Sequence, residues 1–127
     1  MDLPEEIFRE LTAGAQYLPQ KGDAEGRTAP RARASLAVTL VRLNGHKLAK
    51  PTSATIRDIS TRGVGLEFAE PIHVDDSFAI RLPRKDGSYL WLQCLATRWS
   101  PLDGKIYLIG ARFSGIFAPP RVVENAA

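Results

Sequence analysis

The hydrophobic and polar positions divide the chain into one helical segment and a series of strands. Residues 2–18 carry apolar side chains at four-residue steps, which predicts an amphipathic helix. Beyond residue 34, apolar side chains mostly alternate with polar or small ones, as in strands that bury one face. The expected strands cover residues 35–43, 52–59, 64–68, 78–82, 89–99 and 106–113.

Three turn signals separate parts of this pattern and favour antiparallel pairing. They are Asn44-Gly45, Asp86-Gly87 and Asp103-Gly104, and such pairs are typical of tight hairpin turns. Six short strands with a single terminal helix predict an all-β fold, a small antiparallel barrel rather than a parallel α/β architecture. A chain of 127 residues with 44% hydrophobic side chains is expected to form one such domain.

The chain is expected to have four parts. These are an N-terminal helix over residues 1–20, a mobile arginine loop over 21–33, a β-barrel over 34–114 and a flexible tail over 115–127. The loop mixes glycine, proline and charge without apolar periodicity, and the tail contains Pro119-Pro120. The apolar stripe of the helix could dock a partner, but we favour its covering the open end of the barrel.

Charge is distributed unevenly along the chain. The net charge is +3, yet residues 21–50 hold seven basic and two acidic side chains, which makes this segment +5 and the remainder −2. A localised anionic partner would explain the segment, and a solvated surface would explain it equally well. The acidic N-terminus and the lack of a long apolar run predict a cytoplasmic protein without membrane insertion.

The residues that usually carry catalysis or metal binding are not arranged for either. No phosphate loop, dinucleotide-binding motif or nucleophile elbow occurs. His46 and His73 lack partners at metal-ligand spacing, and Ser60 lacks a nearby base. Cys94, the single cysteine, lies in an apolar run and is expected to be a buried, reduced thiol. We therefore expect no enzyme activity, no metal and no cofactor.

Two polar motifs remain as candidate binding residues. Arg27 and Arg31 lie four apart in the loop, and Asp58, Ser60 and Gly63 follow at the end of a strand. Because side chains alternate along a strand, the aspartate and the serine are expected to point the same way, and the glycine permits a tight turn or close approach.

The chemistry of these residue types matches a guanine nucleotide. Arginine can lie on a base, bind the guanine O6/N7 edge or clamp a phosphate, and a carboxylate can accept hydrogen bonds from guanine N1–H and N2–H. Taken singly, each motif has a simpler explanation. The arginine segment alone reads as a solvated loop, and the second motif alone reads equally well as a capped turn.

Together and in this order, Arg-x-x-x-Arg and Asp-x-Ser-x-x-Gly resemble the PilZ family of bacterial cyclic di-GMP receptors. The resemblance covers about residues 27–114 and continues through Gly63-Val64-Gly65-Leu66, Arg98-Trp99 and Gly110-Ala111-Arg112-Phe113. It implies a six-stranded antiparallel barrel whose outer surface holds cyclic di-GMP beneath the arginine loop. Many relatives end in a helix, whereas this chain has a proline-containing tail.

The resemblance also implies a role for each motif position. The ligand-binding positions that it implies are Arg27, Arg31, Asp58, Ser60 and Gly63. The arginines would contact bases and phosphates, the aspartate and serine would hydrogen-bond the ligand, and the glycine would shape the turn. Further side chains are expected only as neighbours of the site, and they are Arg33, Arg62, Trp99 and Arg112.

We thus predict a non-catalytic receptor that orders its arginine loop on binding cyclic di-GMP and signals to a protein partner. One alternative is a basic barrel that binds single-stranded nucleic acid through the loop and exposed aromatics such as Tyr89, Trp91 or Trp99. That alternative leaves Asp58 unexplained, because a carboxylate repels a phosphate backbone. Another is a PilZ-like adaptor that has lost its ligand.

Overall fold

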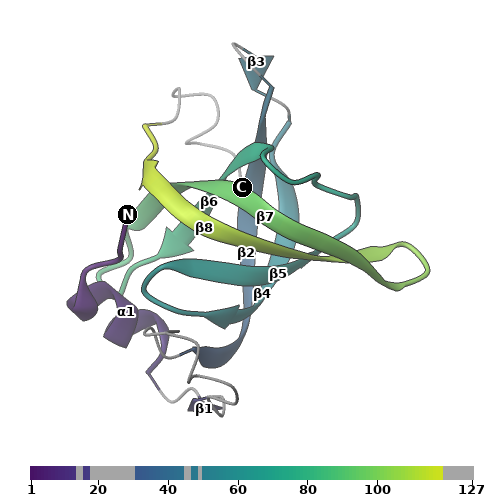
Figure 1. Cartoon of the computed structure of the whole chain (residues 1–127). Helices are drawn as coiled ribbons and strands as arrows, with labels where there is room; N and C mark the ends of the chain where they lie inside the picture. The colour runs from purple at the N-terminus through teal and green to yellow at the C-terminus, as the bar shows by residue number, and fades with distance from the viewer. Residues whose placement is uncertain (14–15, 18–30, 45–46, 49, 119–127) are drawn as a thin grey trace.

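The protein is described by a computed structural model that covers residues 1–13, 16–17, 31–44, 47–48 and 50–118. Its elements are α1 (Glu5–Leu11), β1 (Gln16–Tyr17), β2 (Ala32–Asn44), β3 (Lys47–Leu48), β4 (Thr52–Ile59), β5 (Gly63–Phe68), β6 (Ser77–Pro83), β7 (Tyr89–Asp103) and β8 (Ile106–Ile116). Figure 1 shows the helix beside one end of a strongly curved sheet.

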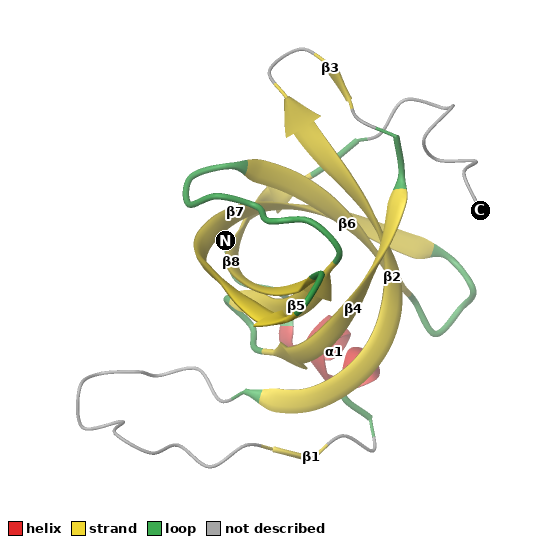
Figure 2. Cartoon of the chain, turned by 90° about the vertical axis from the view of Figure 1, so that its right-hand side faces the viewer, coloured by secondary structure: helices red, strands yellow, loops and turns green. Residues whose placement is uncertain are grey.

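The sheet closes on itself to form a barrel. Six strands follow one another in the order β2-β4-β5-β8-β7-β6, and β6 pairs again with β2, from Thr39 opposite Arg81 to Leu43 opposite Ser77. Every pairing is antiparallel, and Figure 2 shows the resulting ring of strands. Among the described residues, the two-residue strands β1 and β3 each pair with β2 alone. The predicted all-β, six-stranded antiparallel barrel with a short N-terminal helix is confirmed.

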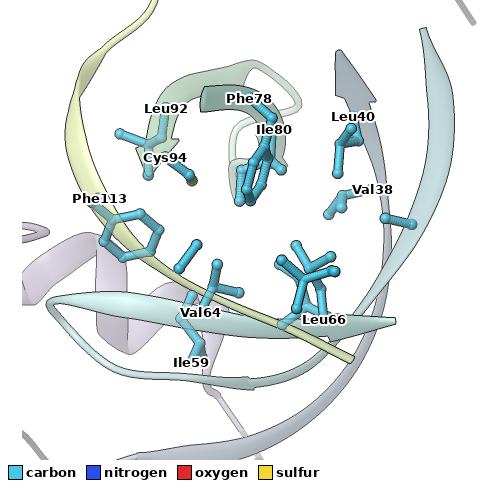
Figure 3. Close-up of a cluster of buried hydrophobic side chains, with 14 of the residues drawn as sticks. Val38, Leu40, Ile59, Val64, Leu66, Phe78, Ile80, Leu92, Cys94 and Phe113 are labelled. Carbon is cyan, nitrogen blue, oxygen red and sulfur yellow. The ribbon is translucent and has the colours of Figure 1, made fainter. Parts of the chain in front are cut away.

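Alternation along the strands explains how the barrel fills. Inward-facing side chains from all six strands form one buried cluster, and Figure 3 shows them converging from opposite walls. The largest fully buried ones include Phe78, Phe113, Leu40, Ile56 and Leu66. Because side chains fill the interior, a ligand must bind on the outer surface or at an end of the barrel.

Cys94 belongs to this core and is fully buried, as the sequence predicted. Burial raises the pKa of its thiol well above the ordinary value, so the reactive thiolate is suppressed. We expect Ellman's reagent to modify Cys94 slowly in the folded protein and rapidly in urea. Fast modification of the native protein at neutral pH would contradict the placement of Cys94.

Helix α1 is shorter than the predicted 2–18. It follows Pro4 and ends at Leu11, where Thr12 turns its hydroxyl back to the carbonyl of Phe8 at 2.7 Å. A β-branched residue that bonds its own preceding turn favours the end of a helix over its continuation. The chain then forms β1, so periodicity alone overestimated the helix.

The apolar side of α1 packs against the barrel. Leu3 and Phe8 belong to the same buried cluster as the inward-facing strand residues. On the polar side, Arg84 donates two hydrogen bonds to Glu10, at 3.1 and 3.2 Å. These bonds, followed by one from the Lys85 N–H, hold the pKa of Glu10 below its ordinary value. This is the covering arrangement that we favoured for the helix.

Several strands run further than the sequence pattern indicated. Ala32 and Arg33, assigned to the loop, pair with β4 as the first residues of β2. At the other end β8 continues to Ile116, inside the predicted tail, and Phe117 then packs against Trp91 with ring centroids 5.9 Å apart. Backbone pairing therefore extends strands through residues with little apolar periodicity. Residues 21–30 of the predicted loop and 119–127 of the predicted tail lie outside the described part, so the mobility predicted for them is untested.

The turn signals predicted the chain reversals correctly. Gly87 and Gly104 have φ of +90° and +50°, and they lie in the turns between β6 and β7 and between β7 and β8. Asn44 pairs with Lys47, so the chain also reverses between them, although Gly45 and His46 lie outside the described residues.

Candidate ligand-binding site

The turn between β4 and β5 is built around the hydroxyl of Ser60. Its Oγ accepts hydrogen bonds from the backbone N–H groups of Arg62 at 3.1 Å and Gly63 at 3.2 Å. The backbone N–H of Ser60 donates to the Gly63 carbonyl at 2.9 Å. Ser60 is only 1% exposed, so this structure gives it the capped-turn role. The Ser60 hydroxyl is thus engaged within the turn, and the expectation that it contacts a ligand together with Asp58 stays a prediction.

Gly63 is required by packing and not by an unusual backbone angle. The described residues with positive φ are Asp75, Gly87 and Gly104. A Cβ at Gly63 would lie 2.2 Å from the carbonyl oxygen of Ala111 in the neighbouring β8. The glycine therefore lets β5 and β8 approach, which places the turn against the rest of the sheet.

The carboxylate of Asp58 is held on the outer face of the barrel. Arg31 donates to its Oδ1 through Nε at 2.8 Å and also through Nη2. On the adjacent strand, a Cβ at Gly65 would lie 2.7 Å from Oδ2 and 2.9 Å from Oδ1. The glycine thus leaves the space that the carboxylate occupies. The side chains of Arg31 and Asp58 are 27% and 24% exposed, so both remain accessible.

A hollow of about 420 Å³ opens beside Asp58 on this outer face. It spans four neighbouring strands and is lined by Arg57, Asp58, Gly65, Arg98, Trp99, Ser100, Leu108, Ile109 and Gly110. Its size lies within the range of roughly 300–1,000 Å³ that is common for small-molecule sites. A second hollow of about 360 Å³ adjoins it, shares Arg57 and Asp58, and reaches Arg33 on β2. Together they form a groove with Asp58 near its middle.

The far wall of the first hollow is formed by Arg98 and Trp99 on β7. The side chain of Arg98 lies across Gly110, where a Cβ would be 2.5 Å from Nε and 2.7 Å from Cγ. Trp99 is 38% exposed, and its ring packs against Tyr107 at a centroid distance of 5.8 Å. A partly exposed aromatic ring that is held in this way offers a surface for stacking a base.

The electrostatics of the groove are mixed. Arg57 is paired with Glu67 at 3.1 Å, so that acidic side chain is partly neutralised. Arg31, Arg33 and Arg98 add positive charge around the carboxylate of Asp58. Such a surface can bind an anion that also carries hydrogen-bond donors, which is a more restrictive requirement than binding a bare phosphate.

The structure brings together some of the predicted residues and leaves others apart. Arg31 and Asp58 meet, and Ser60 and Gly63 form the adjoining turn, whereas Arg27 lies outside the described residues. Among the expected neighbours, Arg33 and Trp99 line hollows, and Arg62 and Arg112 are exposed without lining either one.

Sequence reasoning missed the roles of Arg57, Arg98, Gly65 and Gly110. The available sequence signal was the two glycine patterns, Gly63-Val64-Gly65 and Gly110-Ala111. It could not show that Gly65 and Gly110 are cross-strand partners, because that pairing depends on strand register. Trp91, proposed as an exposed aromatic, is 6% exposed, packs against Phe117 and lies away from both hollows. Tyr89 is exposed but carries the guanidinium of Arg81 over its ring.

The described part of the chain contains no group of three or more side chains suited to holding a metal ion. No helix there is both long and apolar enough to cross a bilayer.

The closed barrel and the charged groove on its outside define a small all-β binding domain. The family model for the PilZ domain matches residues 25–119, so the chain belongs to the PilZ family. PilZ domains are non-catalytic binding or adaptor domains, and the family binds cyclic di-GMP and often protein partners. No curated protein gives a match to the sequence.

Proposed function

We propose that this protein is a cyclic di-GMP receptor that binds the dinucleotide in the groove centred on Asp58. The Arg27–Arg31 segment would then fold over the bound ligand, and the changed surface would be recognised by a protein partner. Signalling by an intracellular second messenger would place the protein in the cytoplasm. No catalytic step is part of this proposal.

The ion pair between Arg31 and Asp58 carries the proposal. These residues belong to different motifs, 27 positions apart in sequence, yet Arg31 contacts Asp58 through two nitrogens. The first motif is thereby anchored beside Asp58, the residue of the second motif that lines both hollows of the groove. Family membership alone does not require these two side chains to meet, so their contact supports a shared site in this particular chain.

A guanine nucleotide can replace this contact on both sides. The N1–H and N2–H groups of its base can donate to the carboxylate, and its phosphate can accept from the guanidinium. A phosphate alone would satisfy only Arg31 and would be repelled by Asp58. Ordering the loop costs about 1–2 kcal/mol for each residue fixed, so the contacts made by Arg27 and Arg31 must exceed that cost. The proposal therefore needs both the base and the phosphates.

Calorimetric titration with cyclic di-GMP tests this proposal. We expect saturable binding to the parent protein, and binding about ten- to a hundredfold weaker or undetectable for Arg31→Ala and Asp58→Ala, because each removes charge-assisted hydrogen bonds worth about 1.5–3 kcal/mol. The stoichiometry would also show whether one or two dinucleotides bind.

Arg9→Ala is the matched control. Arg9 lies on α1 and pairs only with exposed Glu5 in the described structure, so its removal changes the net charge without touching the groove. Binding should be unchanged in this variant, and circular dichroism should show native folding in all three. Absence of saturable binding by the parent, or undiminished binding by Asp58→Ala, is the result that rejects the proposal.

Single-stranded nucleic acid remains the second candidate because Trp99 and Arg98 adjoin on the groove wall. It predicts binding that strengthens with oligonucleotide length and weakens steeply with salt. Adding oligothymidine to the titrations separates the candidates. If neither cyclic di-GMP nor oligothymidine binds, the remaining alternative is a PilZ-like adaptor that has lost its ligand.

A further inference from the structure

We infer that Arg98 is a specificity-determining residue of the groove, and that it reads the O6/N7 edge of a guanine whose N1–H and N2–H groups face Asp58. This inference rests on the proposed function and adds a residue on β7, outside both recognition motifs.

Strand register places Arg98 and Asp58 at opposite ends of one row across the outer face. Asp58 pairs with Gly65, Gly65 with Gly110, and Gly110 with Arg98. Four strands are involved, and neighbouring strands lie ~4.8 Å apart, so the two backbones are about 14 Å apart along the sheet. The two charged side chains therefore extend toward each other from the outer strands of this row, each over one of the two glycines.

The glycines allow each charged side chain to lie close to the sheet. A Cβ at Gly65 would meet the Asp58 carboxylate, and a Cβ at Gly110 would meet Nε, Cγ and Cδ of Arg98. Larger residues in either place would lift these side chains out of the hollow. The paired glycines Gly65 and Gly110 thus determine how close to the sheet the side chains of Asp58 and Arg98 lie.

Each wall residue also follows a register irregularity in its strand. The pairing of β4 with β5 shifts between Ile56 and Asp58, and that of β7 with β8 shifts between Ala96 and Arg98. In β7 the Thr97 hydroxyl donates to the Gly110 carbonyl at 3.1 Å, which fixes the bulged residue. Bulges redirect the side chains next to them and are common beside binding sites.

The charges of the two walls are complementary but do not neutralise each other. In the described part of the chain Asp58 is paired with Arg31, and no ion pair involves Arg98. A ligand between the walls must present donors toward Asp58 and acceptors toward Arg98. Guanine does so, whereas adenine has an amino donor where guanine has O6. The arrangement therefore favours guanine over adenine.

The inference is tested by titrating cyclic di-GMP, its bis-7-deazaguanine analogue and cyclic di-AMP into the parent and Arg98→Met. Methionine retains an apolar side chain that can lie over Gly110 but donates no hydrogen bond. We expect Arg98→Met to weaken cyclic di-GMP binding about ten- to a hundredfold and to reduce the preference over cyclic di-AMP. The deaza analogue lacks N7, so it should bind the parent several-fold more weakly than cyclic di-GMP, and this difference should shrink in Arg98→Met.

Two further variants keep the result interpretable. Lys105→Met removes the same charge from the exposed β7–β8 turn and should bind all three ligands like the parent. Gly110→Ala keeps Arg98 but displaces it, and should reproduce part of the Arg98→Met loss. If the parent binds and the deaza penalty is equal in the parent and Arg98→Met, the role of Arg98 is wrong while the receptor function stands. If the parent binds no cyclic di-GMP, both fail.

Discussion

Gly63→Ala is expected to lower the free energy of unfolding by about 3 kcal/mol or more, because the added Cβ meets backbone that cannot move alone. The nearest atoms are the Ala111 carbonyl oxygen at 2.2 Å and the Arg112 Cα at 3.1 Å. Relief requires β5 and β8 to separate, and Gly63 pairs directly with Arg112 in that ladder. Urea unfolding followed by circular dichroism measures the loss.

Gly115→Ala provides the control for this substitution. Gly115 also lies in β8, but a Cβ there meets no heavy atom within 4 Å and its φ is not positive. The free energy of unfolding of Gly115→Ala should be unchanged or raised by less than about 1 kcal/mol, because alanine has fewer unfolded conformations than glycine. Equal stability of the two variants would show that close packing does not explain Gly63.

The sequence predicted the barrel because its strands have clear boundaries. Alternating apolar residues and X-Gly turns located six strands, and Thr52–Ile59 was predicted with both of its ends correct. Where strands continue without alternation, as in β7 up to Asp103, the pattern stopped short because backbone pairing does not depend on side-chain type. The predicted helix was too long, because apolar residues continue in the sequence beyond Thr12, where the helix ends.

The candidate site could be predicted only where its residues are local in sequence. The hydroxyl of Ser60 and the N–H groups that it caps lie within three residues, so a capped turn was foreseeable. Arg98 and Gly110 line the same hollow as Asp58 only because of the register of four strands and two bulges, which no linear spacing reveals. The motif therefore located one wall of the groove, and the fold was needed to find the other.

Phe8→Ala is expected to cost about 3–5 kcal/mol of stability, as is typical when a buried aromatic side chain is truncated. Phe8 is 5% exposed and packs with Leu3 into the barrel cluster. A seven-residue helix is not stable in isolation, so α1 depends on this contact for its structure. Urea unfolding of Phe8→Ala compared with the parent measures the effect.

The same substitution should also loosen the turn between β4 and β5, because the Leu3 N–H donates to the Thr61 carbonyl at 2.6 Å. Amide hydrogen exchange at Arg62 and Gly63 is therefore expected to accelerate in Phe8→Ala. Glu6→Ala, on the exposed side of the helix, should change stability by no more than about 0.5 kcal/mol and leave exchange at the turn unaltered. If Phe8→Ala behaves like Glu6→Ala, α1 does not cover the barrel end, and its apolar face is free to dock a partner instead.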